Sequence, residues 1–110
     1  MSNVIFSPEV REYFVNLVKI LHEKEYFGSL DFAKKYVQEL YDEIELNLPF
    51  RSHKIAPSIF DCYGSCMYYA TFIKNKRTQY YVFFRIYLEN EVEIYQVRYI
   101  GNNHTIAQHL

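Results

Sequence analysis

The chain has 110 residues, which is enough for one domain with one hydrophobic core and excludes two independent domains. Half of the residues are apolar, 23% are charged, and there are only three Gly and three Pro, so the composition excludes a disordered, linker or collagen-like chain. The apolar stretches are much shorter than the roughly 18 residues that a membrane span needs, and Met1–Phe6 is too short and uncharged for a signal sequence. We therefore expect a cytoplasmic protein without a membrane partner.

Charge is distributed unevenly along the chain, although the net charge is only −1. Residues 1–50 carry five Lys or Arg and nine Asp or Glu, whereas residues 51–110 carry seven and four, so an anionic partner is expected to bind the second half. Eight of the 12 Tyr lie after residue 60. Because a buried Tyr needs a hydrogen-bond partner, this density favours a sheet with one solvated face or a binding surface. The alternative is that these Tyr serve only as strand formers.

The first predicted elements are a short edge strand at residues 3–7 and an amphipathic helix at residues 8–26. Ser7 is a suitable cap, Pro8 is favoured at the first helical position because its missing N–H costs nothing there, and Glu9 is favourable in the positive first turn. The apolar stripe of this helix, at three- and four-residue spacing, consists of Val10, Tyr13, Phe14, Leu17, Val18 and Leu21.

A second helix is predicted at residues 30–48. Gly28 supplies a left-handed stop for the first helix, Ser29 caps the second, and Pro49 ends it. The apolar stripe of the second helix consists of Ala33, Tyr36, Val37, Leu40, Ile44 and Leu48. Because the link between the two helices is short, they should be antiparallel neighbours.

The second half is predicted to form a three-stranded antiparallel meander after an irregular connection at residues 50–65. Runs rich in β-branched and aromatic residues, separated by short polar turns, indicate the strands. The strands are expected at residues 67–74, 80–88 and 92–100. The polar stretch 101–103 should then turn the chain into a tail that contains His104 and His109.

Alternation along the middle strand assigns its side chains to two faces of the sheet. The face under the helices is expected to carry Val82, Phe84, Ile86 and Leu88, and the bare face Tyr81, Phe83, Arg85 and Tyr87. The same rule places Gln96 and Arg98 on the bare face with Arg85, and Tyr99 on the helix side. The predicted fold class is α+β: one domain over residues 1–110, with an antiparallel sheet and a helical hairpin packed on one face.

Three stretches of this pattern resemble the RelE/ParE superfamily of bacterial toxins, and together with the order of elements the likeness covers nearly the whole chain. The stretch "IFSPEVREYF" (Ile5–Phe14) is similar to the family's opening strand and capped helix. The stretch "RTQYYVFFRI" (Arg77–Ile86) is similar to its central strand, and "VEIYQVRYIGNNH" (Val92–His104) to its last strand and the polar turn after it.

This resemblance implies the toxin of a type II toxin–antitoxin or plasmid stabilisation module, which inhibits growth until a cognate antitoxin protein binds it. RelE-like members are metal-independent endoribonucleases that cleave mRNA on the ribosome, whereas ParE-like members poison DNA gyrase. The residues leave both targets open, and no cofactor is implied. The alternative is a protein of a different class, namely a non-catalytic interaction module that kept the fold without toxicity.

Cleavage of RNA needs a base for the 2′-hydroxyl proton, cations for the phosphate and an acid for the leaving 5′-oxygen. The resemblance implies Arg85, Arg98, His104 and Tyr81 as the catalytic candidates. Tyr81 stands where the family's central strand often has Arg, and Arg85 matches a position that is basic in many ParE-like sequences. Histidine suits acid–base chemistry because its charge changes near neutral pH, although a histidine in a polar turn is more often only exposed.

The RNA- or partner-binding candidates are Lys74, Lys76, Arg77 and Gln96. The planar donors of Arg suit phosphate and carboxylate groups, so these cations could meet RNA or an acidic antitoxin segment. The alternative is that they are solvated strand residues that prevent edge-to-edge aggregation.

Two cysteines, Cys62 and Cys66, form a C-x3-C pair, with His53 and His104 as conceivable further ligands. A zinc site needs four well-placed ligands, and this spacing is irregular, so no metal is predicted. We expect reduced thiols, one of them buried.

Overall fold

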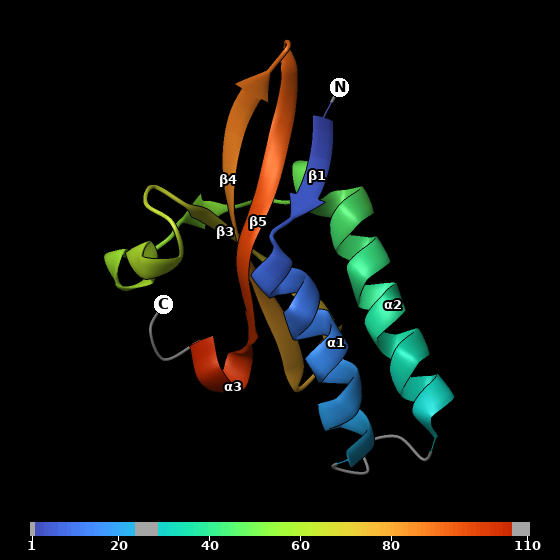
Figure 1. Cartoon of the computed structure of the whole chain (residues 1–110). Coiled ribbons are helices and arrows are strands. Elements are labelled where there is room, and N and C mark those ends of the chain that lie inside the picture. The colour runs from blue at the N-terminus through green and yellow to red at the C-terminus, as the bar shows by residue number, and fades with distance from the viewer. Residues whose placement is uncertain (1, 24–28, 107–110) are drawn as a thin grey trace.

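A five-stranded mixed sheet forms the centre of an α+β fold (Figure 1). The computed structural model describes residues 2–23 and 29–106. The sheet has the order β1-β5-β4-β3-β2. Its strands are β1 (Ser2–Phe6), β2 (Lys54–Ile55), β3 (Tyr68–Asn75), β4 (Thr78–Glu89) and β5 (Val92–Asn102). The helices are α1 (Pro8–Glu23), α2 (Leu30–Asn47) and the short α3 (Asn103–Ile106), with the 3₁₀ helices η1 (Leu48–Phe50) and η2 (Ser58–Tyr63).

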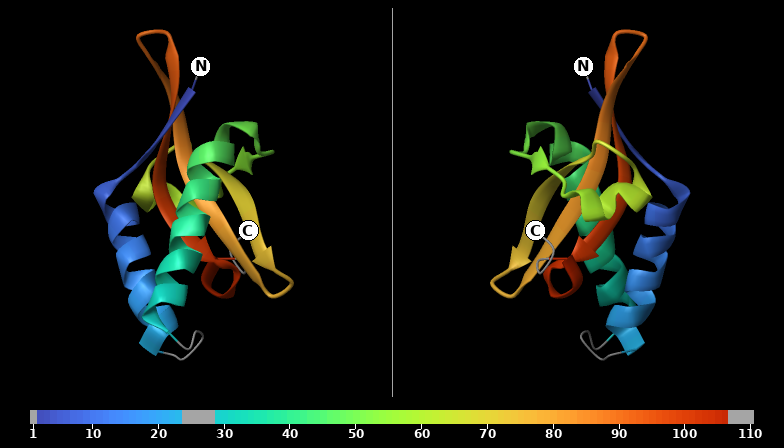
Figure 2. Two further views of the ribbon diagram at one scale, coloured as in Figure 1. Left: turned by 90° about the vertical axis from the view of Figure 1, so that its right-hand side faces the viewer. Right: turned by 90° about the vertical axis from the view of Figure 1, so that its left-hand side faces the viewer.

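Helices α1 and α2 confirm the two predicted helices and lie side by side on one face of the sheet (Figure 2). Each has its predicted cap: Ser7 Oγ accepts from the Val10 N–H at 3.4 Å, and Ser29 Oγ accepts from the Phe32 N–H at 3.2 Å. These bonds satisfy N–H groups that a first helical turn leaves unpaired. The predicted end of the first helix at residues 24–26 and its stop at Gly28 lie outside the described residues.

The main core lies between this hairpin and the sheet. Its buried side chains include most of the two predicted stripes and the predicted inner face of β4. They are Phe6, Val10, Phe14, Leu17, Val37, Leu40, Ile44, Leu48, Ala70, Phe72, Tyr80, Val82, Phe84, Tyr95, Val97 and Ile100. Leu88 was expected here too, but it is 72% exposed because the β4–β5 ribbon extends beyond the helices (Figure 1).

The sheet is not antiparallel throughout, which corrects the predicted fold class. The meander β3-β4-β5 is antiparallel, but β1 pairs with β5 in parallel, in the register Ser2↔Glu93 to Phe6↔Val97. Only strands joined by a tight turn must be antiparallel. Because the helical hairpin and the meander separate β1 from β5, no turn in the sequence fixes their relative direction.

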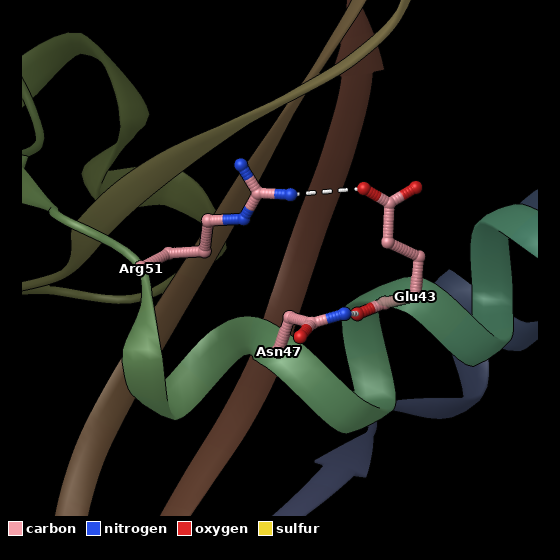
Figure 3. Close-up of polar contacts among 3 residues, drawn as sticks. All are labelled: Glu43, Asn47 and Arg51. Atoms are coloured by element: carbon pink, nitrogen blue, oxygen red, sulfur yellow. Dashed lines mark hydrogen bonds and ion pairs between the residues drawn. The ribbon is translucent and has the colours of Figure 1, made fainter.

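The predicted irregular connection at residues 50–65 contains ordered structure. Strand β2 adds a fifth strand by pairing Lys54 with Tyr69 and Ile55 with Tyr68. Figure 3 shows how the preceding turn is fixed: Arg51 Nη2 lies 2.9 Å from Glu43 Oε1 on α2, and Asn47 Nδ2 donates to the Glu43 carbonyl. A two-residue strand has too little periodicity to be found from sequence.

A bulge in β5 reverses one side-chain assignment. Phe84 pairs with Val97 but Phe83 pairs with Tyr99, so Arg98 is an extra residue in β5. After this insertion the alternation changes phase, and Tyr99 lies with Phe83 on the face away from α1 and α2. The prediction that Tyr99 faces the helices is therefore wrong.

The face opposite the helical hairpin carries a second, smaller core and is not bare. Helices η2 and α3 cover part of it, on the other side of the sheet from α1 and α2 (Figure 1). Its buried residues are Phe60, Met67, Phe83 and Ile106, and Ala56, Tyr69, Tyr81 and Tyr99 pack around them. Strand β5 also extends through Gly101 and Asn102, which pair with Tyr81 and Tyr80 instead of forming the predicted turn.

Candidate functional site

On the face away from the helical hairpin, Arg85 and Arg98 both lie beside the segment Tyr63–Gly64. Arg98 Nε donates to the Tyr63 carbonyl at 3.0 Å. A Cβ placed on Gly64 would lie 3.6 Å from Arg85 Cδ, so the stem of Arg85 packs beside this glycine. Gln96 pairs directly with Arg85 across the β4–β5 ladder. We call Arg85, Gln96 and Arg98 the arginine cluster; their predicted common face is confirmed.

A second group of predicted residues lies at the other end of β4, and we call Lys76, Arg77, Tyr81 and His104 the α3–turn cluster. Asn103, next to His104, joins its parts: its Nδ2 donates to the Arg77 carbonyl at 3.1 Å, and its Oδ1 accepts from the Gln79 N–H at 3.2 Å. The Tyr81 hydroxyl lies 3.4 Å from Gln79 Oε1. His104 is exposed, and its backbone N–H donates to Asn102 Oδ1 at 3.0 Å.

The two clusters are separate, so the four catalytic candidates do not form one site. Tyr81 and Arg85 are four residues apart on β4, which corresponds to about 13 Å. Phe83, between them, lies under η2 and α3 in the second core. Direct transfer of a proton needs heavy atoms about 3 Å apart, and within the described residues no hydrogen bond joins one cluster to the other.

Lys74 belongs to neither cluster. Its Nζ lies 4.7 Å from the centre of the Tyr36 ring on α2, a cation–π contact on the helix side of the sheet. Alternation on β3 explains this position, because Phe72 and Lys74 share the face that packs on the hairpin. The cations of the sheet are therefore not one patch.

A pocket of about 320 Å³ opens at the edge of β5, beyond the point where β1 ends. We call it the β5-edge pocket; it is lined by Glu9, Val10, Tyr13, Cys62, Tyr63, Arg98, Tyr99 and Ile100. The rings of Tyr63 and Tyr99 stack in its wall with centroids 3.8 Å apart and planes 7° apart. Sequence reasoning missed Tyr63 because nothing in the irregular segment indicates which strand it covers.

Two of the phenols that line this pocket, those of Tyr13 and Tyr99, have pKa values above the ordinary value for tyrosine. Burial, and then the neighbouring Tyr63, raises the pKa of Tyr99 to about 12. Burial, and then Tyr99, raises the pKa of Tyr13 to about 12. Burial and the Tyr36 hydroxyl, 3.4 Å away, also raise the pKa of Tyr80, which lies in the main core and not in the pocket. These groups can donate hydrogen bonds but cannot act as bases near neutral pH.

A wider polar groove of about 840 Å³ lies where β2 separates from β3. It is lined by Phe50, Arg51, Ser52, His53, Lys54, Tyr69, Ala70, Thr71 and Tyr81. The guanidinium of Arg51 is held by Glu43 and lies 4.6 Å from the centre of the Phe72 ring (Figure 3). Sequence patterns did not indicate this groove, because β2 was not predicted.

Cys62 and Cys66 are both exposed free thiols, so the expectation that one of them is buried is wrong. Within residues 2–23 and 29–106, no three His, Cys, Asp or Glu side chains gather as a metal ion would require. None of the helices in these ranges is long and apolar enough to cross a membrane. His109 lies outside the described residues.

Comparisons of the chain with protein-family models, with curated proteins and with solved structures found no match.

Proposed function

We propose that this chain is the toxin of a type II toxin–antitoxin module of the RelE/ParE type. The main support is the division of the molecule into two faces. A short edge strand and a helical hairpin precede the meander, and the hairpin covers one face of the sheet. The predicted target-binding residues other than Lys74 lie on the opposite face or at its end. This is the arrangement that the sequence resemblance implies for such a toxin.

Cleavage of mRNA is the first candidate activity, and the α3–turn cluster is its candidate site. There, exposed His104 would take the 2′-hydroxyl proton or protonate the leaving 5′-oxygen. Lys76 and Arg77, both exposed at the β3–β4 turn, would stabilise the phosphate as the 2′-oxygen attacks it. The products would be a 2′,3′-cyclic phosphate and a 5′-hydroxyl, and no metal takes part.

Poisoning of DNA gyrase is the second candidate, and the position of the arginine cluster favours it. Arg85 is exposed but separated from His104 by the second core, so His104 is not placed to act as its acid–base partner. A cationic surface of this kind can bind a partner protein but cannot cleave a phosphodiester.

Expression of the chain alone in a bacterium tests the proposal. Growth should stop, and co-expression of an antitoxin from the neighbouring gene should restore it. Lys19→Ala, which changes an exposed cation on α1, is the matched control and should remain toxic. Unimpaired growth at good protein yield would reject the toxin and support the non-catalytic interaction module.

A translating extract and a supercoiling assay then separate the two activities. For the nuclease, mRNA should be cut, and the cuts should disappear in His104→Ala but persist in Arg85→Ala. For the gyrase poison, the message should stay intact and supercoiling should be blocked, and Arg85→Ala should relieve the block. Toxicity that survives both substitutions would show that neither cluster is the site.

A further inference from the structure

The β5-edge pocket combines two opposite charges with an aromatic lining. Glu9 comes from the first turn of α1, and Arg98 comes from the bulge of β5. Within the described ranges 2–23 and 29–106, neither side chain forms an ion pair, and only Nε of Arg98 is bonded, to the Tyr63 carbonyl. The carboxylate of Glu9 and the outer nitrogens of Arg98 are therefore available to a ligand.

The size of the pocket limits the ligand to a small molecule. A volume of about 320 Å³ is at the lower end of the range for ligand pockets. Three tyrosine side chains, Tyr13, Tyr63 and Tyr99, contribute rings to its lining, and such rings pack well against an aromatic or branched apolar group. The acidic and the basic side chain of the lining are Glu9 and Arg98.

This distribution of charge selects a zwitterion. A guanidinium binds a carboxylate through two parallel hydrogen bonds, and a carboxylate accepts from an ammonium group. We propose that the β5-edge pocket binds a free α-amino acid with an aromatic or branched apolar side chain. Arg98 binds its carboxylate, Glu9 binds its ammonium group, and Tyr13, Tyr63 and Tyr99 contact its side chain. This site does not depend on the proposed toxin activity.

Calorimetric titration of the full chain with L-phenylalanine and three analogues tests the ligand class. 3-Phenylpropionate lacks the ammonium group, 2-phenylethylamine lacks the carboxylate, and L-alanine lacks the apolar side chain. L-Phenylalanine or L-leucine should bind, and each analogue should bind at least about tenfold more weakly than L-phenylalanine. Absence of binding by both amino acids up to about 10 mM, or equal binding of all four phenylalanine-series ligands, would overturn the proposal.

The two exposed cysteines provide an independent test of location, because Cys62 lines the pocket and Cys66 does not. In Cys66→Ser, saturating L-phenylalanine should slow the reaction of Cys62 with a maleimide several-fold. In the matched variant Cys62→Ser, the same ligand should leave the reaction of Cys66 unchanged. Equal rates with and without ligand in both variants, or equal slowing in both, would place the ligand elsewhere.

Removal of either charged side chain by substitution with Gln tests the two polar contacts. Arg98→Gln and Glu9→Gln should each weaken L-phenylalanine binding at least about tenfold, and Glu12→Gln, an exposed acid of α1 outside the pocket, should not. Because Arg98 also holds the Tyr63 carbonyl, Glu9→Gln is the cleaner variant. It should bind 3-phenylpropionate more tightly than the unchanged chain does, because a like charge is removed. Weaker binding of 3-phenylpropionate to Glu9→Gln would contradict the assigned role of Glu9.

Discussion

Arg98 Nε donates to the backbone carbonyl of Tyr63 at 3.0 Å, and this bond joins the bulge of β5 to the end of η2. The two residues are 35 positions apart in sequence. The same contact places the stacked rings of Tyr63 and Tyr99 in the wall of the β5-edge pocket. The position of η2 over the sheet thus depends on a side chain that alternation alone would treat as an ordinary strand residue.

Removal of this bond should destabilise the fold moderately. Arg98→Ala is expected to lower the free energy of unfolding by about 1 kcal/mol, because the Tyr63 carbonyl loses its donor while remaining partly accessible to water. Urea denaturation followed by circular dichroism measures the change. Arg77→Ala, at the exposed β3–β4 turn, is the control and should change stability by less than about 0.5 kcal/mol. Equal losses in the two variants would show that the bond contributes nothing specific.

The second core should contribute much more to the free energy of unfolding than the Arg98–Tyr63 hydrogen bond does. Phe60 is 5% exposed and its ring centroid lies 4.5 Å from that of Phe83, whereas the adjacent Ile59 is 58% exposed. Phe60→Ala is expected to cost about 3 kcal/mol through lost burial and a new cavity. Ile59→Ala should cost less than about 0.5 kcal/mol. The same urea experiment compares the two, and similar losses would mean that η2 does not pack on the sheet as described.

The β4–β5 turn contains backbone strain that a substitution should relieve. Asn90 and Glu91 have φ values of 52° and 67°, the left-handed conformation that a two-residue hairpin turn requires at both positions. Asn tolerates this conformation, but Glu does so at a cost. Glu91→Gly is therefore expected to raise the thermal midpoint, with a gain of about 0.5 kcal/mol. Glu89→Gly, at the last paired position of β4, should lower the thermal midpoint. A lower midpoint for Glu91→Gly would contradict the turn geometry.

Stability should fall in alkaline solution through the buried phenols. The pKa of Tyr13 is about 12 in the folded protein, against 10.0 for an ordinary tyrosine, so the folded chain retains this proton when the unfolded chain loses it. The contribution of neutral Tyr13 is therefore complete below about pH 10 and is lost as the pH rises to about 12, by roughly 3 kcal/mol at most.

Urea midpoints between about pH 8 and pH 12 test this dependence. In Tyr13→Phe, which has no proton to lose, the decline should be shallower than in the unchanged chain. Tyr87→Phe, at a 37% exposed position of β4, should leave the decline as it is. An identical decline in all three proteins would assign the effect to other groups.

The sequence alone was sufficient to predict the features that depend on neighbouring residues in the chain. Ser7 and Ser29 cap the helices because their hydroxyls accept from N–H groups three residues later, and the stripes of α1 and α2 follow from helical periodicity. Alternation in β4 placed Val82 and Phe84 in the main core and Arg85 on the opposite face. Each of these features is decided within a few residues.

Only the tertiary structure decided the features that depend on distant parts of the chain. The parallel direction of β1 follows from the path of the helical hairpin, and one inserted residue at Arg98 moves Tyr99 to the other face. The covering of that face by Phe60 and Ile106 separates Arg85 from His104 and divides the predicted site. A hydrophobic pattern with a period of two or 3.6 residues indicates which side of its own strand or helix a residue occupies. It contains no information on which other element will pack against that side, because that choice is made by the fold as a whole.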